Sequence, residues 1–118
     1  MHARMVYLIT LPDKRSDLQK MMEKKLAPLL GSQEGLLEYL TLISDQEPRR
    51  AVLISIWSSQ EYAEAFDQQT FPTIFQKLKP LLQTDPRIMT FDCSLHRNHL
   101  SASAAALVAK SPDRRKDN

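Results

Sequence analysis

The chain has little cysteine, little glycine and no long apolar run, and each shortage excludes a class of protein. A single cysteine, Cys93, cannot form an internal disulfide or a multi-cysteine metal site. Two glycines, Gly31 and Gly35, are too few for a glycine-rich phosphate loop. No apolar run approaches the roughly 20 residues that span a bilayer. The N-terminal segment is too short and too quickly polar for a signal peptide. We therefore expect a cytoplasmic protein with no membrane contact.

An excess of one charge is also missing. The 118 residues include 16 basic and 14 acidic side chains, which leave a formal net charge of +2. Tyr7 and Tyr39 could stack on bases from an open sheet face, but the electrostatic attraction that nucleic-acid binding needs is small. His2, His96 and His99 lie at the two ends of the domain, and no further ligands are evident beside them. We expect no nucleic-acid partner, no metal and no other cofactor.

The composition changes near residue 97. A chain of 118 residues suits one domain. Residues 98–118 are rich in serine and alanine and then charged, with no aromatic side chain, so they can bury little apolar area. We predict a folded domain over residues 3–97 and a flexible C-terminal tail over residues 98–118. The alternative for the tail is a short helix at 104–108 that docks on a neighbour.

The spacing of the apolar residues predicts the secondary structure. Runs of β-forming residues predict four strands, at 5–11, 36–44, 51–57 and 88–95. Apolar residues at intervals of three or four predict a helix through Leu18, Met22, Leu26 and Leu29. A capping box at Ser58 predicts the start of a second helix, which breaks near Thr70. The order β-α-β-β-α-β is the α+β, ferredoxin-like arrangement, a four-stranded antiparallel sheet with both helices on one face.

The predicted sheet is apolar on both faces. Apolar or aromatic side chains occupy both faces of its first three strands. They include Val6, Leu8, Leu37, Tyr39, Val52, Ile54 and Ile56. An antiparallel sheet with one solvated face would show polar residues there. A second copy of the chain is the simplest cover, so we predict a homodimer through packed sheet faces.

Large aromatic side chains are expected in the layer between the sheet and the helices. They are either plain core or the wall of a pocket for a small aromatic ligand. In the pocket interpretation the substrate-binding side chains are Tyr62, Phe66, Phe71 and Phe75. The polar groups of the same pocket would come from Tyr7, Trp57 and Gln76.

The run SIWSSQEYAEAFDQQTFPTIFQKLKPLL resembles the signature of antibiotic biosynthesis monooxygenase (ABM) domains. The shared features are a strand that ends in Trp57, a Ser-x-Glu helix start, an aromatic residue or histidine about nine residues on, a break and a second helix. Gly35 before the second strand fits as well. The resemblance covers residues 4–97 and implies a dimeric α/β barrel of two ferredoxin-like subunits. Many such proteins oxidise phenolic, quinol or anthrone-type aromatics with O2, using no metal or flavin.

Matched residue by residue, the resemblance narrows the activity. Haem-degrading members carry an asparagine, a tryptophan and a haem-ligating histidine where this chain has Tyr7, Phe66 and Gln76. We therefore do not expect haem degradation. The histidine that common members carry at the position of Phe66 is also missing, which removes the obvious base.

The resemblance leaves two hypotheses for function. The first is a cofactor-independent monooxygenase that oxidises a small quinol-like or phenol-like substrate. Its catalytic residues would be Tyr7, Trp57 and Gln76, with the Tyr7 hydroxyl donating a hydrogen bond to a developing oxyanion. The second is a non-catalytic ligand-binding or regulatory dimer, because a fold does not determine a function.

Overall fold

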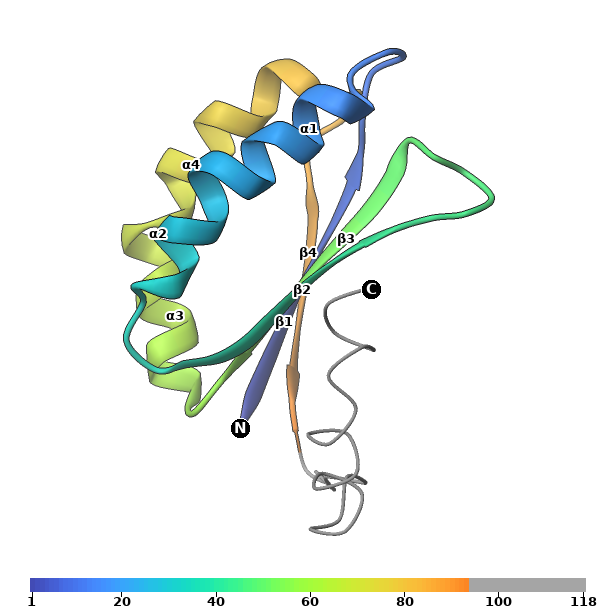
Figure 1. The fold of residues 1–118 in the computed structure, drawn as a ribbon. Helices are drawn as coiled ribbons and strands as arrows, with labels where there is room; N and C mark the ends of the chain where they lie inside the picture. The colour runs from blue at the N-terminus through green and yellow to red at the C-terminus, as the bar shows by residue number, and fades with distance from the viewer. Residues whose placement is uncertain (94–118) are drawn as a thin grey trace, which may run out of the picture.

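The structure is a computed structural model that describes residues 1–93, and these form one sheet with helices over one face (Figure 1). The elements in chain order are β1 (His2–Ile9), α1 (Arg15–Met21), the π-helical turn η1 (Met22–Leu26), α2 (Ala27–Gly31), β2 (Leu36–Ile43), β3 (Arg50–Trp57), α3 (Gln60–Gln69), α4 (Phe71–Leu78), the 3₁₀ turn η2 (Lys79–Leu81) and β4 (Arg87–Asp92). The predicted order of strands and helices is confirmed. The predicted domain end at residue 97 and the predicted tail lie outside the described residues.

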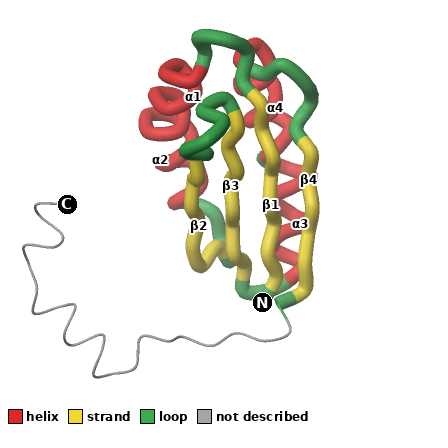
Figure 2. The backbone as a smooth tube through the Cα atoms, turned by 90° about the vertical axis from the view of Figure 1, so that its right-hand side faces the viewer, coloured by secondary structure: helices red, strands yellow, loops and turns green. Residues whose placement is uncertain are grey.

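The four strands are hydrogen-bonded in the order β2-β3-β1-β4, and every neighbouring pair is antiparallel (Figure 2). The two central strands are β1 and β3, which pair over their whole length from His2 opposite Trp57 to Ile9 opposite Arg50. This order and direction confirm the ferredoxin-like α+β fold.

Alternation along β1 decides which side chains face the helices. His2, Arg4, Val6 and Leu8 are buried, while the residues between them are half-buried. The core therefore lies on the helix side of the sheet, and its fully buried side chains include Trp57, Leu8, Leu18, Leu26, Leu78 and Val6. Each such side chain stabilises the fold by about 1.5–3 kcal/mol through its removal from water.

The first helical segment is continuous but contains a widened turn. Leu18, Met22 and Leu26 are buried along it, as their spacing predicted. The turn η1 lies just before Pro28, where the Ala27 N–H donates to the Met22 carbonyl five residues earlier. Proline lacks the N–H that would continue a regular α-helical ladder, so the change of hydrogen-bond pattern falls at this point. No helix in the described range is both long and apolar enough to cross a membrane.

The second helical segment is broken as predicted, but its cap is one residue later than expected. Ser59, not Ser58, has the extended backbone of an N-cap, and its hydroxyl accepts a hydrogen bond from the Tyr62 N–H at 3.4 Å. Helix α3 ends just before Thr70, and α4 begins at once with Pro72 in its first turn. Proline is tolerated there because the first N–H groups of a helix have no partner in the helix itself.

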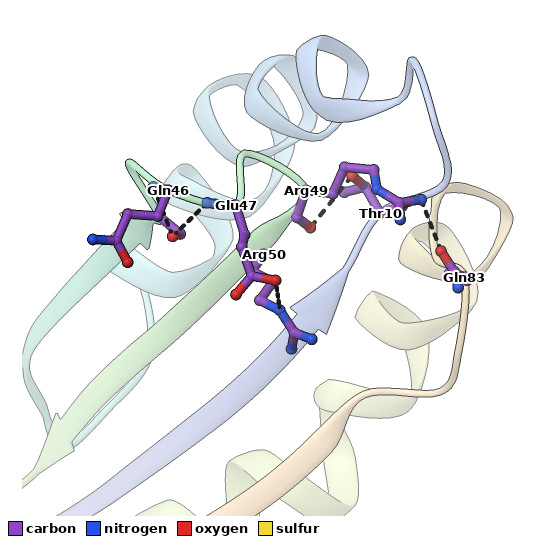
Figure 3. Close-up of polar contacts among 7 residues, drawn as sticks. Thr10, Gln46, Glu47, Arg49, Arg50 and Gln83 are labelled. Carbon is purple, nitrogen blue, oxygen red and sulfur yellow. Dashed lines mark hydrogen bonds and ion pairs between the residues drawn. The ribbon is translucent and has the colours of Figure 1, made fainter.

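The polar turn between β2 and β3 is tied to the rest of the sheet by its own side chains (Figure 3). Arg49 Nη1 donates to Gln83 Oε1 at 2.8 Å, which joins the start of β3 to the segment that leads into β4. Arg50 Nε and Glu47 Oε1 form an exposed ion pair at 2.9 Å. Such an exposed pair contributes at most about 1 kcal/mol, so it orients the turn more than it stabilises the protein.

The face of the sheet away from the helices is apolar in the described part of the chain. Figure 2 looks onto this face, with the helices behind the strands. Leu40 and Leu42 of β2 and Phe91 of β4, which the strand register places on this face, are 47%, 49% and 42% exposed. The predicted two-sided apolar sheet is therefore confirmed for these strands.

Candidate ligand-binding cavity

A cavity of about 320 Å³ lies between the sheet and the helices. Its wall is shared by β1, β2 and β3 on one side and by both helical segments on the other. The side chains that matter below are Arg4, Met22, Glu23, Tyr39, Thr41, Ser55, Phe66 and Phe71. This volume is at the lower end of the range for small-molecule sites. The lining residues Glu23 and Thr41 are exposed, so the cavity reaches solvent between η1 and β2.

The part of the cavity wall that α3 and α4 form is aromatic. The ring of Phe66 lies 5.0 Å from the ring of Trp57 and 6.4 Å from that of Phe71, measured between centroids. Phe66 and Phe71 line the cavity, while Trp57 lies behind Phe66 and is fully buried. Tilted ring pairs at these distances add about 0.5–1.5 kcal/mol beyond their buried area. The wall is therefore a firm apolar surface against which a planar ligand could pack.

Arg4 brings a buried cation into this apolar setting. Its guanidinium donates from Nη2 and Nε to Asp67 Oδ1, at 2.6 Å and 3.1 Å. The guanidinium carbon lies 4.1 Å from the centroid of the Phe71 ring and 5.4 Å from that of Phe66. Burial lowers the pKa of Arg4, and the hydrogen bond and charge of Asp67 partly oppose that shift. Arginine remains charged at neutral pH, so the wall carries a positive charge.

The other polar groups in the lining are neutral or exposed. Ser55 is buried beside Arg4 in the sheet register, and its hydroxyl accepts a hydrogen bond from Trp57 Nε1 at 2.9 Å. Tyr39 is half-buried on the helix side of β2. Glu23 is exposed on η1. Within residues 1–93, no group of three histidine, cysteine, aspartate or glutamate side chains could hold a metal ion.

Of the four predicted substrate-binding residues, two line the cavity. Phe66 and Phe71 do so, and their role in binding a substrate stays a prediction. Phe75 is instead half-buried next to Phe71, with stacked rings 6.4 Å apart. Tyr62 is 38% exposed and packs against Gly35 at the start of α3. The carboxylate of Glu34 raises the pKa of Tyr62, which disfavours a phenolate at that site.

The predicted polar members of the pocket do not line the cavity, and their expected place is corrected. Tyr7 lies on the helix-free face, because it alternates with the helix-facing Val6 and Leu8, and its hydroxyl donates to the Met5 sulfur at 3.7 Å. Gln76 is exposed, since it lies on the side of α4 away from Ile74. Trp57 is buried, and its only side-chain N–H donates to the Ser55 hydroxyl. The catalytic roles expected of these three residues stay predictions.

The sequence interpretation missed Arg4, although a signal for it was present. The alternation that places Val6 and Leu8 on one face of β1 also places Arg4 on that face. A charged residue in register with core positions is rarely buried without a partner. Asp67, 63 residues later in the chain, is that partner, and only the packing of α3 over β1 brings the two together.

Comparisons with known proteins agree on the fold. No family model and no curated protein sequence matches the chain. A structure from Deinococcus radiodurans, described as a candidate antibiotic biosynthesis monooxygenase, is 16% identical with a TM-score of 0.73, and the match covers 86% of this chain and 100% of that one. A candidate of the same name from Nitrosomonas europaea is also 16% identical, with a TM-score of 0.70 over 80% of this chain and 100% of that one.

A third such structure, from Bordetella bronchiseptica, is 14% identical with a TM-score of 0.67, and the match covers 80% of this chain and 97% of the other. Identities this low establish a shared fold rather than a shared activity. The chain thus has the ferredoxin-like fold of the ABM structures, as the resemblance implied.

Proposed function

We propose that the protein is a cofactor-independent monooxygenase of the ABM type that oxidises a small phenol-like or quinol-like aromatic with O2. The observation that carries the proposal is the cavity of about 320 Å³ with Phe66 and Phe71 in its wall. Flat aromatic walls suit a flat aromatic substrate. The fold shared with the ABM structures supports the same assignment.

The proposed reaction balances without another redox partner. A phenol with an unsubstituted para carbon loses its hydroxyl proton and its para hydrogen. One oxygen atom of O2 becomes the second carbonyl of the quinone, and the other leaves as water with these two hydrogens. The substrate supplies all four electrons. The protein's part is to position the ring and keep water away from the carbanion-like intermediate, which the apolar wall of Phe66 and Phe71 is suited to do.

Oxygen uptake tests this proposal directly. Metal-stripped protein is given a panel of quinols, naphthols and anthrones, with autoxidation blanks. We expect saturable uptake and a quinone product. Thr41→Phe, which narrows the exposed side of the cavity, is expected to reduce kcat/KM severalfold. Thr73→Phe, at an exposed position of α4 outside the cavity lining, is the matched control. Uptake no faster than the blanks across the panel would contradict the oxygenase proposal.

One observation favours a second candidate, a non-catalytic binding protein for the same ligands. Among residues 1–93, the only carboxylate in the cavity lining is that of Glu23, which is exposed, and no histidine lines the cavity. A general base is usually shielded and within hydrogen-bond reach of the proton it removes. Tight binding of a panel compound without oxygen uptake would establish this second function.

We also infer that the protein forms a homodimer through the helix-free face of the sheet. The support is the apolar surface formed by Leu40, Leu42 and Phe91, which a monomer would leave in water. Sedimentation should give twice the chain mass. Leu40→Lys with Leu42→Lys should shift the protein toward monomer, whereas Gln76→Lys on the exposed side of α4 should not. A wild-type protein that sediments as a monomer at micromolar concentration would overturn the inference.

A further inference from the structure

The Arg4 guanidinium uses only part of its hydrogen-bonding capacity. Arginine has five N–H donors, and Asp67 Oδ1 accepts from one on Nε and one on Nη2. The remaining three donors have no acceptor within residues 1–93, although the Arg4 side chain is only 3% exposed. Arg4 Nη1 is nevertheless not among the fully buried unpartnered atoms of the described residues, so it reaches open space. The open space beside Arg4 is the cavity that it lines, so a ligand acceptor that enters the cavity can replace water at these donors.

The guanidinium is also held in one orientation. It lies over the Phe71 ring, with Phe66 close by, and Asp67 holds it from α3. A guanidinium carries its N–H groups in one plane, and the groups that Asp67 leaves free can bind a carboxylate or another oxyanion. Arg4 is therefore pre-organised as a donor for an anionic oxygen next to an aromatic wall.

We propose that the cavity selects aromatic ligands that carry an anionic oxygen, and that Arg4 is the residue that recognises this oxygen. The aromatic class of the ligand rests on the proposed function, and the present proposal adds that the ligand is an anion. The apolar wall would contact the ring, and the free N–H donors of Arg4 would bind a phenolate or carboxylate oxygen. Hydrogen bonds between two charged groups contribute about 1.5–3 kcal/mol, which corresponds to about tenfold to a hundredfold in affinity.

Two carboxylates compete with such a ligand. Asp67 is 45% exposed and in direct contact with Arg4, so its negative charge offsets much of the attraction. Glu23 is the other acidic residue near the site, but it is exposed on η1 and is screened by solvent. Removing the charge of Asp67 while keeping its oxygen should therefore strengthen anion binding, and this change is the sharper of the available tests.

The experiment compares an anionic probe with a neutral one that has the same nitro-substituted ring and one additional methyl group. Para-nitrophenol is ionised at mildly alkaline pH, whereas para-nitroanisole has no proton to lose. Trp57 is the only tryptophan, and its ring lies 5.0 Å from that of the cavity residue Phe66, so quenching of its fluorescence reports occupancy for both probes. The variants are Arg4→Met, which keeps an unbranched side chain over Phe71, and Asp67→Asn. Arg50→Gln, in the exposed turn pair with Glu47, is the control.

We expect the wild type to bind nitrophenolate at least tenfold more tightly than nitroanisole. Arg4→Met should abolish this preference while leaving nitroanisole affinity within about twofold, and Asp67→Asn should increase it severalfold. Arg50→Gln should match the wild type. Equal binding of the two probes by the wild type would overturn the role of Arg4, as would a preference that survives Arg4→Met or falls in Asp67→Asn.

The two probes also separate this proposal from the one on which it rests. Should neither probe bind, both the aromatic site and the role of Arg4 are wrong. An anion preference that depends on Arg4, in a protein that consumes no oxygen, would support the recognition site and reject the oxygenase. Oxygen uptake that is equally fast in the wild type and in Arg4→Met would support the oxygenase and reject Arg4 as the residue that recognises the ligand.

Discussion

Trp57 Nε1 donates a 2.9 Å hydrogen bond to the hydroxyl of Ser55, two residues earlier on the same face of β3. The indole is fully buried and Ser55 is 7% exposed. Ser55 is also the register partner of Arg4 on β1 and lines the cavity. The bond therefore places the largest core side chain behind the aromatic wall and satisfies its one polar atom.

Ser55→Ala should destabilise the protein by about 1–3 kcal/mol, because the buried indole N–H loses its acceptor. Urea unfolding followed by Trp57 fluorescence measures the change. Ser16→Ala is the control: Ser16 is exposed in the first turn of α1 and should change the free energy of unfolding by no more than about 0.5 kcal/mol. Equal effects of the two substitutions would show that the hydrogen bond contributes nothing.

The two glycines should respond oppositely to alanine. Gly35 has φ +83°, and a Cβ there would collide with the ring of Tyr62. Left-handed backbone alone costs a non-glycine residue about 1–2 kcal/mol, so Gly35→Ala should lower the free energy of unfolding by at least that much. Gly31 ends α2, and a methyl group on its Cα would meet no atom within 4 Å. Gly31→Ala should therefore be neutral or stabilise by up to about 1 kcal/mol.

A Tyr62→Ala variant separates the cost of the left-handed backbone at Gly35 from the cost of the collision with the Tyr62 ring. In a Tyr62→Ala protein the collision is absent, so Gly35→Ala should cost only the backbone term. Thermal unfolding of the four proteins in this cycle measures the coupling. An unchanged cost in the Tyr62→Ala background would mean that the ring moves aside freely.

The two serines before α3 distinguish the observed cap from the predicted one. Ser59→Ala should cost about 1 kcal/mol, since the Tyr62 N–H loses the oxygen that caps it. Ser58 is exposed, and Ser58→Ala should be close to neutral. Chemical unfolding of both variants tests the assignment, and a larger loss for Ser58→Ala would restore the cap predicted from the sequence.

Substitutions of Tyr7 and Tyr39 test which of the two tyrosines contacts a ligand in the cavity. Tyr7→Phe changes a hydroxyl on the helix-free face, so affinity for para-nitrophenol should stay within about twofold. Tyr39→Leu removes a ring from the cavity lining, and affinity should fall severalfold because the ligand loses aromatic contact. Trp57 quenching measures both. Loss of binding in Tyr7→Phe would mean that a ligand reaches the other face of the sheet.

Much of the fold was predictable because it depends on short-range patterns. Alternation of apolar residues defines the strands, intervals of three and four define the helices, and both periods follow from backbone geometry. The break near Thr70 was visible in Pro72, and the turn before β2 was visible in Gly35. The N-cap was missed by one residue, since Ser58 and Ser59 are chemically alike and only the backbone angles decide between them.

The cavity was predictable only in part. Phe66 and Phe71 belong to apolar stripes of their helices, so their inward direction follows from the sequence. The direction of Tyr7 was also implied by alternation, but the sequence does not say which face of an apolar two-sided sheet the helices cover. That choice depends on the packing of the helices over the sheet as a whole.

The sequence by itself therefore determined the elements, their order and the two apolar faces of the sheet, because these depend on local periodicity and on chain connectivity. Tertiary structure alone decided which face holds the cavity and which polar groups lie in it. The pairing of Arg4 with Asp67 over Phe71 is the clearest case. These residues are distant in the chain, no local propensity links them, and their contact arises only when α3 and α4 pack across β1.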